Sequence, residues 1–182
     1  MKAVFFDRDG VLNKSLLGPE GKPLAPRRLE DFSVYDEIRP VVNYIISKGF
    51  LALVVTNQPD VGNGLVSSSV VNKMNQILVE KLGITEVFSC MHSQADRCDC
   101  RKPGIGMFLK AKSKFGLDLN NCIMVGDRYG DMLGARRAGI IGKVFIDYGY
   151  LESREYNFES CEPIVKISTR KNLMQALISL GI

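Results

Sequence analysis

Two carboxylates near the start of the chain are placed to act on one reacting atom. Asp7 and Asp9 are separated by one residue and are followed by Gly10. On an extended segment their side chains point the same way, and their charges repel unless a cation or a shared proton offsets them. A carboxylate can attack phosphorus to form an aspartyl-phosphate, and a second carboxyl group can protonate the leaving oxygen and then activate water. We therefore expect this pair of carboxylates to be able to act on a phosphate ester.

Proton transfer falls to Asp9 by elimination. Histidine is the usual residue for this task, but the only histidine is His92, which lies in a cysteine cluster. A plainer interpretation is that Asp-x-Asp-Gly is merely a turn, since Asp and Gly favour turns. Its position directly after an apolar segment, with Asp127 after a later one, disfavours the turn.

Further carboxylates are expected beside Asp7. Asp127 ends another apolar segment, and Asp131 lies four residues later at the start of a predicted helix. Hard oxygen ligands of this kind, with room left for water and a phosphate, suit Mg²⁺. The sequence thus predicts an acidic magnesium site next to the nucleophile.

Four residues have the chemistry to hold a phosphate ester. Thr56 and Asn57 offer a hydroxyl and backbone amides after a second apolar segment. Lys102 offers a point charge, and Arg101 offers a planar fork for a second anionic or hydroxyl-bearing group. In isolation, Thr56 could simply cap the end of a strand, and Arg101 and Lys102 could simply be a solvated basic pair. Together they would neutralise the charge on a transferring phosphoryl group, the main task in this chemistry.

A cluster of thiols and an imidazole precedes Arg101. Cys90, His92, Cys98 and Cys100 lie within eleven positions. Three cysteines and one histidine suit a closed, tetrahedral structural zinc site. The alternative is a set of reduced cysteines in a loop beside an unrelated histidine. The spacing is tighter than in common zinc fingers, so a nucleic-acid finger is not indicated. We expect Zn²⁺ to fold this loop and to position Arg101 and Lys102.

The apolar pattern predicts the elements that position these residues. Short apolar runs predict strands at 3–6, 51–55, 87–88, 122–125, 144–146 and 164–167. Helical spacing predicts helices at 36–48, 67–82, 107–115, 129–138 and 173–180, and residues 14–30 are expected to form a long loop. Alternating strands and helices predict an α/β fold with a doubly wound, Rossmann-like parallel sheet. Ligands bind beyond the carboxyl ends of such strands, where Asp7, Thr56 and Asp127 lie.

Composition limits the class of protein. The chain has 182 residues, which suits a single domain over 1–182, and a net charge of +4 without a basic tract. We expect no nucleic-acid partner. No apolar run reaches membrane-spanning length, and the start of the chain lacks the long apolar stretch of a signal peptide. We expect a cytoplasmic protein without a membrane partner, whose cysteines are thiols or metal ligands.

These motifs resemble those of the haloacid dehalogenase-like superfamily, in its branch with a minimal cap and a zinc loop. The resemblance covers about residues 1–150 and rests on four ordered motifs, Asp7–Asn13, Thr56–Gln58, Arg101–Pro103 and Gly126–Asp131. It implies Asp7 as nucleophile, Asp9 as general acid/base, and Thr56 and Lys102 as phosphoryl stabilisers. It also implies Mg²⁺ held by Asp7, Asp127 and the Asp9 carbonyl, and substrate contacts from Asn57, Arg101 and Arg128.

Two departures bear on the substrate. The zinc-loop branch includes phosphatases for D-glycero-D-manno-heptose 1,7-bisphosphate and for histidinol phosphate. The heptose enzymes usually carry an arginine where this chain has Asn63, and a proline where it has Ile105. We expect a small phosphorylated metabolite, a sugar phosphate of the heptose bisphosphate type, with histidinol phosphate as the alternative. A zinc-stabilised binding protein without turnover is the alternative of another class, and the intact catalytic motifs speak against it.

Overall fold

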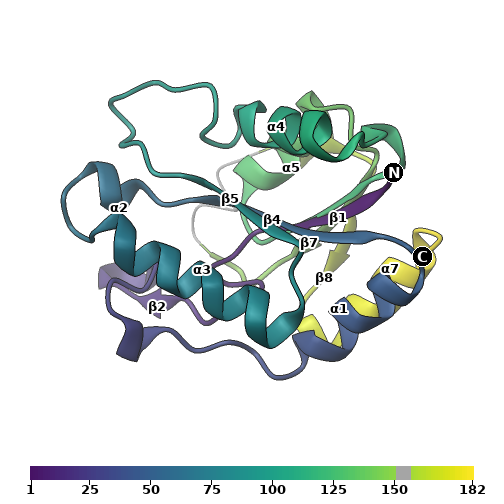
Figure 1. Ribbon diagram of the computed structural model, residues 1–182. Helices are drawn as coiled ribbons and strands as arrows, with labels where there is room; N and C mark the ends of the chain where they lie inside the picture. Colours follow the sequence, from purple (N-terminus) through teal and green to yellow (C-terminus); the bar gives the residue numbers. More distant parts are fainter. Residues whose placement is uncertain (151–156) are drawn as a thin grey trace.

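A six-stranded parallel sheet forms the centre of the computed structural model, which describes residues 1–150 and 157–182 (Figure 1). The strands follow the order β5-β4-β1-β6-β7-β8. Their bounds are Ala3–Phe6 (β1), Leu51–Asn57 (β4), Glu86–Cys90 (β5), Ile123–Gly126 (β6), Gly142–Ile146 (β7) and Val165–Ile167 (β8). The expected α/β fold is confirmed.

Strand β1 occupies the middle of this sheet. Its four residues, Ala-Val-Phe-Phe, are fully buried, as a parallel strand covered on both faces requires. Val4 lies next to Ala52 of β4 on one side and Ile123 of β6 on the other. Because β1 ends at Phe6, the chain delivers Asp7 to the centre of the carboxyl edge.

Helices cover both faces of the sheet (Figure 1). One face is packed by α1 (Ile38–Ser47), α3 (Ser68–Leu82) and α7 (Leu173–Ser179), and the other by α4 (Gly106–Phe115) and α5 (Tyr129–Arg137). All five lie within two residues of their predicted bounds. Helix α3 shows why: the Ser67 side chain caps its start, and Gly83 at φ 77° ends it in a left-handed turn.

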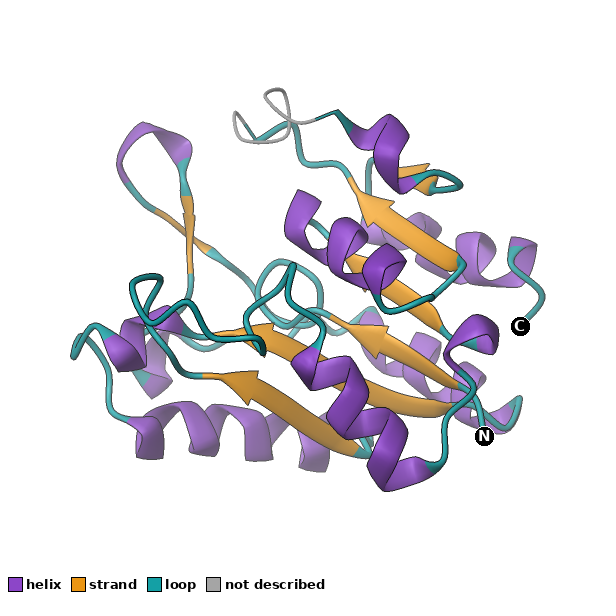
Figure 2. Cartoon of the chain, turned by 90° about the horizontal axis from the view of Figure 1, so that it is seen from above, coloured by secondary structure: helices purple, strands orange, loops and turns teal. Residues whose placement is uncertain are grey.

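The segment 14–30 is not the loop that the sequence predicts. It contains a small antiparallel hairpin of β2 (Leu16–Leu17) and β3 (Pro23–Leu24), whose strands are too short to show a period of two. Figure 2 shows the hairpin standing away from the sheet, on the side to which the strand arrows point. A short helix, α2 (Pro59–Gly62), was also not expected. The hairpin lies in the segment that connects β1 to α1.

Two cysteines outside the predicted zinc loop belong to the core. Cys122 was expected there, whereas Cys161 had no assigned place; both are buried in the cluster beneath α4 and α5. The sequence segment 152–161 that showed no pattern lies partly outside the described residues. Among the helices that the structure describes, none is both long and apolar enough to cross a bilayer.

Candidate active site

Asp7 and Lys102 form the centre of the site. The Asp7 amide donates to the Val125 carbonyl at 2.9 Å, which continues the sheet ladder and fixes the backbone. The Lys102 ammonium lies 2.7 Å from Asp7 Oδ1 and 2.6 Å from Asp131 Oδ1, and it donates to the Val55 carbonyl at 2.6 Å. Lys102 is 5% exposed, so three acceptors hold a charge that water scarcely reaches. The pair is therefore fixed at the carboxyl edge of the sheet, where both side chains line the cavity described below.

Burial and crowding of carboxylates change the protonation of this centre. Burial raises the pKa of Asp7 to about 6, and the charges of Asp131 and Asp9 add to the effect while Lys102 opposes it. Burial alone would lower the pKa of Lys102, but Asp131 and Asp7 outweigh it and raise the value. The Lys102 ammonium therefore stays charged.

Asp127 completes an acidic cluster suited to a cation. One carboxylate oxygen from each of Asp7, Asp127 and Asp131 lies within 4.8 Å of the others. Both Asp127 oxygens are buried and have no hydrogen-bond partner among the described residues, and burial raises the Asp127 pKa. The Asp127 charge in turn contributes, after burial, to a raised pKa of Tyr150. Orphaned, buried carboxylate oxygens of this kind fit Mg²⁺.

A reciprocal pair of hydrogen bonds joins the end of β4 to the loop that carries Lys102. Asn57 Nδ2 donates to the Lys102 carbonyl at 3.0 Å, and the Lys102 amide donates to Asn57 Oδ1 at 2.9 Å. Thr56 and Asn57 are the last two residues of β4, whereas the sequence placed them after the strand. Thr56 is 1% exposed. Sequence reasoning assigned Asn57 to the substrate; the structure also gives its amide the task of fixing Lys102.

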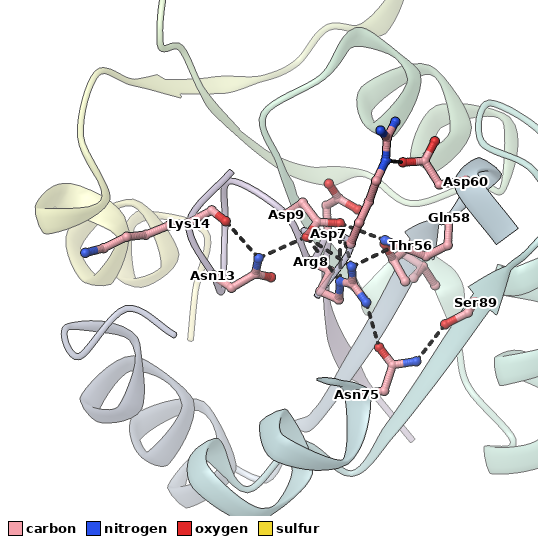
Figure 3. Close-up of polar contacts among 12 residues, drawn as sticks. Asp7, Arg8, Asp9, Asn13, Lys14, Thr56, Gln58, Asp60, Asn75 and Ser89 are labelled. Carbon is pink, nitrogen blue, oxygen red and sulfur yellow. Dashed lines mark hydrogen bonds and ion pairs between the residues drawn. The ribbon is translucent and has the colours of Figure 1, made fainter. Parts of the chain in front are cut away.

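The Asp9 carboxylate is surrounded by side chains that donate hydrogen bonds to it (Figure 3). Asn13 Nδ2 donates to Oδ1 at 2.9 Å, and Gln58 Nε2 donates to Oδ2 at 2.7 Å. The buried Arg8 lies beside it, with Nη2 3.1 Å from Oδ2. Arg8 and Gln58 were not singled out from the sequence, although an arginine between two carboxylates at the end of a buried strand was a visible signal.

A cavity of about 790 Å³ opens over these groups. Its lining includes Asp7, Asp9, Asn57 and Lys102, together with the positively charged residues Arg101, Arg128 and Lys22. The Nη1 atom of Arg101 is buried without a partner among the described residues. Arg128 Nη2 donates to the Pro23 carbonyl at 3.2 Å and so ties the fourth motif to the hairpin. Lys22, also on the hairpin, was not anticipated from the sequence.

The Cys/His cluster forms beside this cavity. The Sγ atoms of Cys90, Cys98 and Cys100 lie 3.3 to 3.5 Å apart. His92 Nδ1 lies 3.2 Å from Cys100 Sγ and 3.7 Å from Cys90 Sγ. In a tetrahedral zinc site with bonds of about 2.3 Å, sulfur ligands lie about 3.8 Å apart. All four cluster residues converge, and the three cysteines are free thiols. The donor set and its spacing fit zinc.

Comparison with known proteins agrees with this geometry. The sequence matches the family model described as haloacid dehalogenase-like hydrolase over residues 16–139, a span that includes Thr56, Lys102 and Asp127. This chain belongs to the haloacid dehalogenase-like hydrolases. The expected enzyme class and superfamily are thereby confirmed.

Curated relatives within this family carry consistent names. The chain is 33% identical over 146 residues to D-glycero-alpha-D-manno-heptose-1,7-bisphosphate 7-phosphatase of Campylobacter jejuni, covering 76% of this chain and 78% of the relative. It is 31% identical over 160 residues to D-glycero-beta-D-manno-heptose-1,7-bisphosphate 7-phosphatase of Haemophilus ducreyi, covering 81% of this chain and 84% of the relative. Among solved structures, D,D-heptose 1.7-bisphosphate phosphatase from B. bronchiseptica, complexed with magnesium and phosphate, superposes with a TM-score of 0.83 at 20% identity over the whole of both chains. That structural likeness shows the shared fold.

Proposed function

We propose that this haloacid dehalogenase-like hydrolase is a Mg²⁺-dependent phosphatase acting on a heptose 1,7-bisphosphate. The observation that carries the proposal is the convergence of Asp7, Lys102 and Asp131 at one end of a cavity lined by further cations. The names of the relatives at about 30% identity supply the substrate class. Every side chain the reaction needs comes from one edge of the sheet, so we treat residues 1–182 as one catalytic domain.

In the proposed reaction Asp7 attacks phosphorus and the bond to the leaving oxygen breaks. Lys102 orients Asp7 and balances charge on the phosphoryl oxygens, and the Thr56 hydroxyl assists it. Asp9 gives its proton to the leaving oxygen, then takes a proton from the water that hydrolyses the aspartyl-phosphate. Mg²⁺ held by Asp7, Asp127 and the Asp9 carbonyl would supply the positive charge that lets a carboxylate approach an anionic phosphate.

The cavity suits a substrate with a second anionic group. Its volume is within the usual range for small-molecule sites, about 300 to 1,000 Å³. Arg101 offers an unpaired buried nitrogen, and Arg128 and Lys22 add charge on the side of the hairpin. A bisphosphate places one phosphate at Asp7 and the other among these cations. The relatives named for the alpha and the beta heptose bisphosphate have nearly the same sequence identity to this chain, 33% and 31%, so both anomers are candidate substrates.

We also propose that Cys90, His92, Cys98 and Cys100 bind Zn²⁺ as a structural site. Their spacing and lack of a disulfide support it. Cys100 directly precedes Arg101, so a closed zinc site would hold the start of the segment that carries Arg101 and Lys102. Elemental analysis of protein purified without chelators should find one zinc per chain, and its absence would reject the site.

The decisive experiment is a panel of phosphate esters assayed with Mg²⁺. It compares kcat/KM for both anomers of the heptose bisphosphate, for histidinol phosphate and for a simple sugar monophosphate. We expect a heptose bisphosphate to lead and Asp7→Asn to abolish phosphate release. A clear preference for histidinol phosphate would replace the substrate but keep the mechanism. No release from any ester would reject the enzyme and favour a binding protein.

A further inference from the structure

A fully buried arginine lies behind the proposed proton donor. Arg8 is 0% exposed and is the largest fully buried side chain among the described residues. It does not line the substrate cavity. Arg8 and Asp9 would point to opposite faces of a regular strand, but the chain turns here, with the Leu12 amide donating to the Arg8 carbonyl at 2.9 Å. This turn brings the two side chains together.

The guanidinium of Arg8 is held by three residues from separate segments: Asp9 in the loop after β1, Gln58 directly after β4, and Asn75 in α3 (Figure 3). Its Nε and Nη2 atoms lie 3.1 to 3.3 Å from the Asp9 carboxylate oxygens, a side-on pair. Nη2 also donates to Gln58 Oε1 at 2.8 Å, and Nη1 donates to Asn75 Oδ1 at 3.1 Å. Because the fork is planar, these bonds leave its orientation no freedom.

The network continues away from the site through α3. Asn75, 9% exposed, donates to the Ser89 hydroxyl of β5 at 3.0 Å. On the other side, Gln58 donates to both Asp9 Oδ2 at 2.7 Å and the Thr56 hydroxyl at 2.9 Å. A chain of hydrogen bonds thus runs from β5 through α3 and Arg8 to the carboxylate of Asp9.

Stability alone gives a weak reason for this arrangement. A buried ion pair pays a large desolvation penalty, and apolar side chains of similar volume are often as stabilising. The donors that surround Asp9 instead restrict both of its oxygens to one position at the cavity wall. A proton donor must lie within hydrogen-bond reach of the leaving oxygen, so a restricted carboxylate is a functional requirement.

We infer that Arg8 is a positioning residue that fixes Asp9 for proton transfer, and that Asn75 fixes Arg8. The inference rests on the proposed phosphatase function but not on the identity of the substrate. Neither residue touches the reacting atoms; both act through the Asp9 carboxylate.

The chemistry of the leaving group separates this role from a merely structural one. When the ester bond of a sugar phosphate breaks, the bonding electrons go to an alkoxide-like oxygen, which needs the proton from Asp9. When the substrate is 2,4-dinitrophenyl phosphate, the electrons go to a stable phenolate that needs no proton. The later hydrolysis of the aspartyl-phosphate is the same for both esters, and kcat/KM reports the attack on the ester without that later step. A defect in Asp9 positioning therefore lowers kcat/KM much more for the sugar phosphate than for the aryl phosphate, whereas a defect in folding or phosphate binding lowers it for both.

The test measures kcat and KM on both esters for Arg8→Gln, Arg8→Lys and Asn75→Ala. The control is Asn72→Ala, an exposed asparagine on the same helix. We expect Arg8→Gln to lower kcat/KM for the sugar phosphate about 10²-fold, within the usual contribution of general acid catalysis, with a loss for the aryl ester at least tenfold smaller. Arg8→Lys and Asn75→Ala should show smaller selective losses, and the control none.

A double-mutant cycle decides whether Arg8 acts through Asp9. In an Asp9→Asn background, Arg8→Gln should add no further selective loss, because its target is gone. Equal losses on the two esters, or full additivity with Asp9→Asn, would overturn the inference. If Arg8→Gln does not fold, Asn75→Ala takes its place in the same cycle. A parent chain that releases no phosphate from either ester would mean instead that the proposed function fails.

Discussion

The crowding of carboxylates around Asp7 should make the metal-free protein less stable as the pH rises. Burial, Asp131 and Asp9 raise the pKa of Asp7 from 3.8 to about 6 against the opposing charge of Lys102. A carboxyl group with a higher pKa in the folded state holds its proton more tightly there than in the unfolded chain. Its contribution to stability therefore falls as the pH increases from about 4 to about 6, and stays low above that range.

The size of this effect follows from the shift itself. A pKa that rises from 3.8 to about 6 corresponds to about 3 kcal/mol of lost stability at neutral pH. Asn at position 7 is neutral at every pH but keeps an oxygen to accept the Lys102 hydrogen bond. We therefore expect Asp7→Asn to be more stable than the parent chain at pH 7 by about 2 to 3 kcal/mol without metal, although it is inactive.

Urea denaturation followed by circular dichroism measures this difference. Parent and Asp7→Asn are compared in EDTA from about pH 4 to pH 7, with Asp36→Asn as the control for loss of an exposed carboxylate. The difference in the free energy of unfolding between the parent and Asp7→Asn should increase from about pH 4 to pH 7. Mg²⁺ should reduce this difference by binding the acidic cluster of the folded parent. A gap that is constant with pH, or a variant less stable than its parent at pH 7, would refute the reasoning.

Three further changes test other parts of the site. Lys102→Met should lower kcat about 10²- to 10³-fold, measured by phosphate release, while Lys110→Met on the exposed face of α4 leaves it unchanged. Gly126→Ala would place a Cβ 2.4 Å from the Asp131 side chain, so urea denaturation should show a loss of about 1 to 3 kcal/mol; an unaffected midpoint would contradict the tight packing. Removal of zinc by a strong chelator should free the Cys98 thiol to react with a thiol reagent, and equal reactivity before chelation would speak against a bound metal.

The residues that could be predicted from the sequence share one property: each follows a short apolar run. Asp7, Thr56 and Asp127 are recognisable because an uninterrupted apolar run of four or five residues marks a buried parallel strand, and parallel strands end at the same edge. The local sequence pattern was therefore enough to predict that these three residues lie close together. The helices were predictable for a similar reason, because the apolar spacing of a helix is a local pattern that repeats over a few turns.

The support of these residues was not predictable in this way. The contact of Arg8 with Asn75 spans 67 positions, and that of Asn57 with Lys102 spans 45. No local pattern marks such pairs, because the contacts depend on how α3 and the segment after the Cys/His cluster pack on the sheet. The hairpin of 16–24 was missed for a different reason: two residues per strand are too few to show alternation.

The central place of β1 also has a consequence for biosynthesis. Strand β1 is translated before the other strands of the sheet, and its two partners follow about fifty and about one hundred and twenty residues later, as the register of Val4 with Ala52 and Ile123 shows. Until β6 has emerged, the nascent chain exposes one edge of an entirely apolar strand. The centre of the sheet therefore closes only after β6 has been translated, which makes its folding a late event with high contact order. Newly made chains should depend on chaperones that bind short apolar strands until that point.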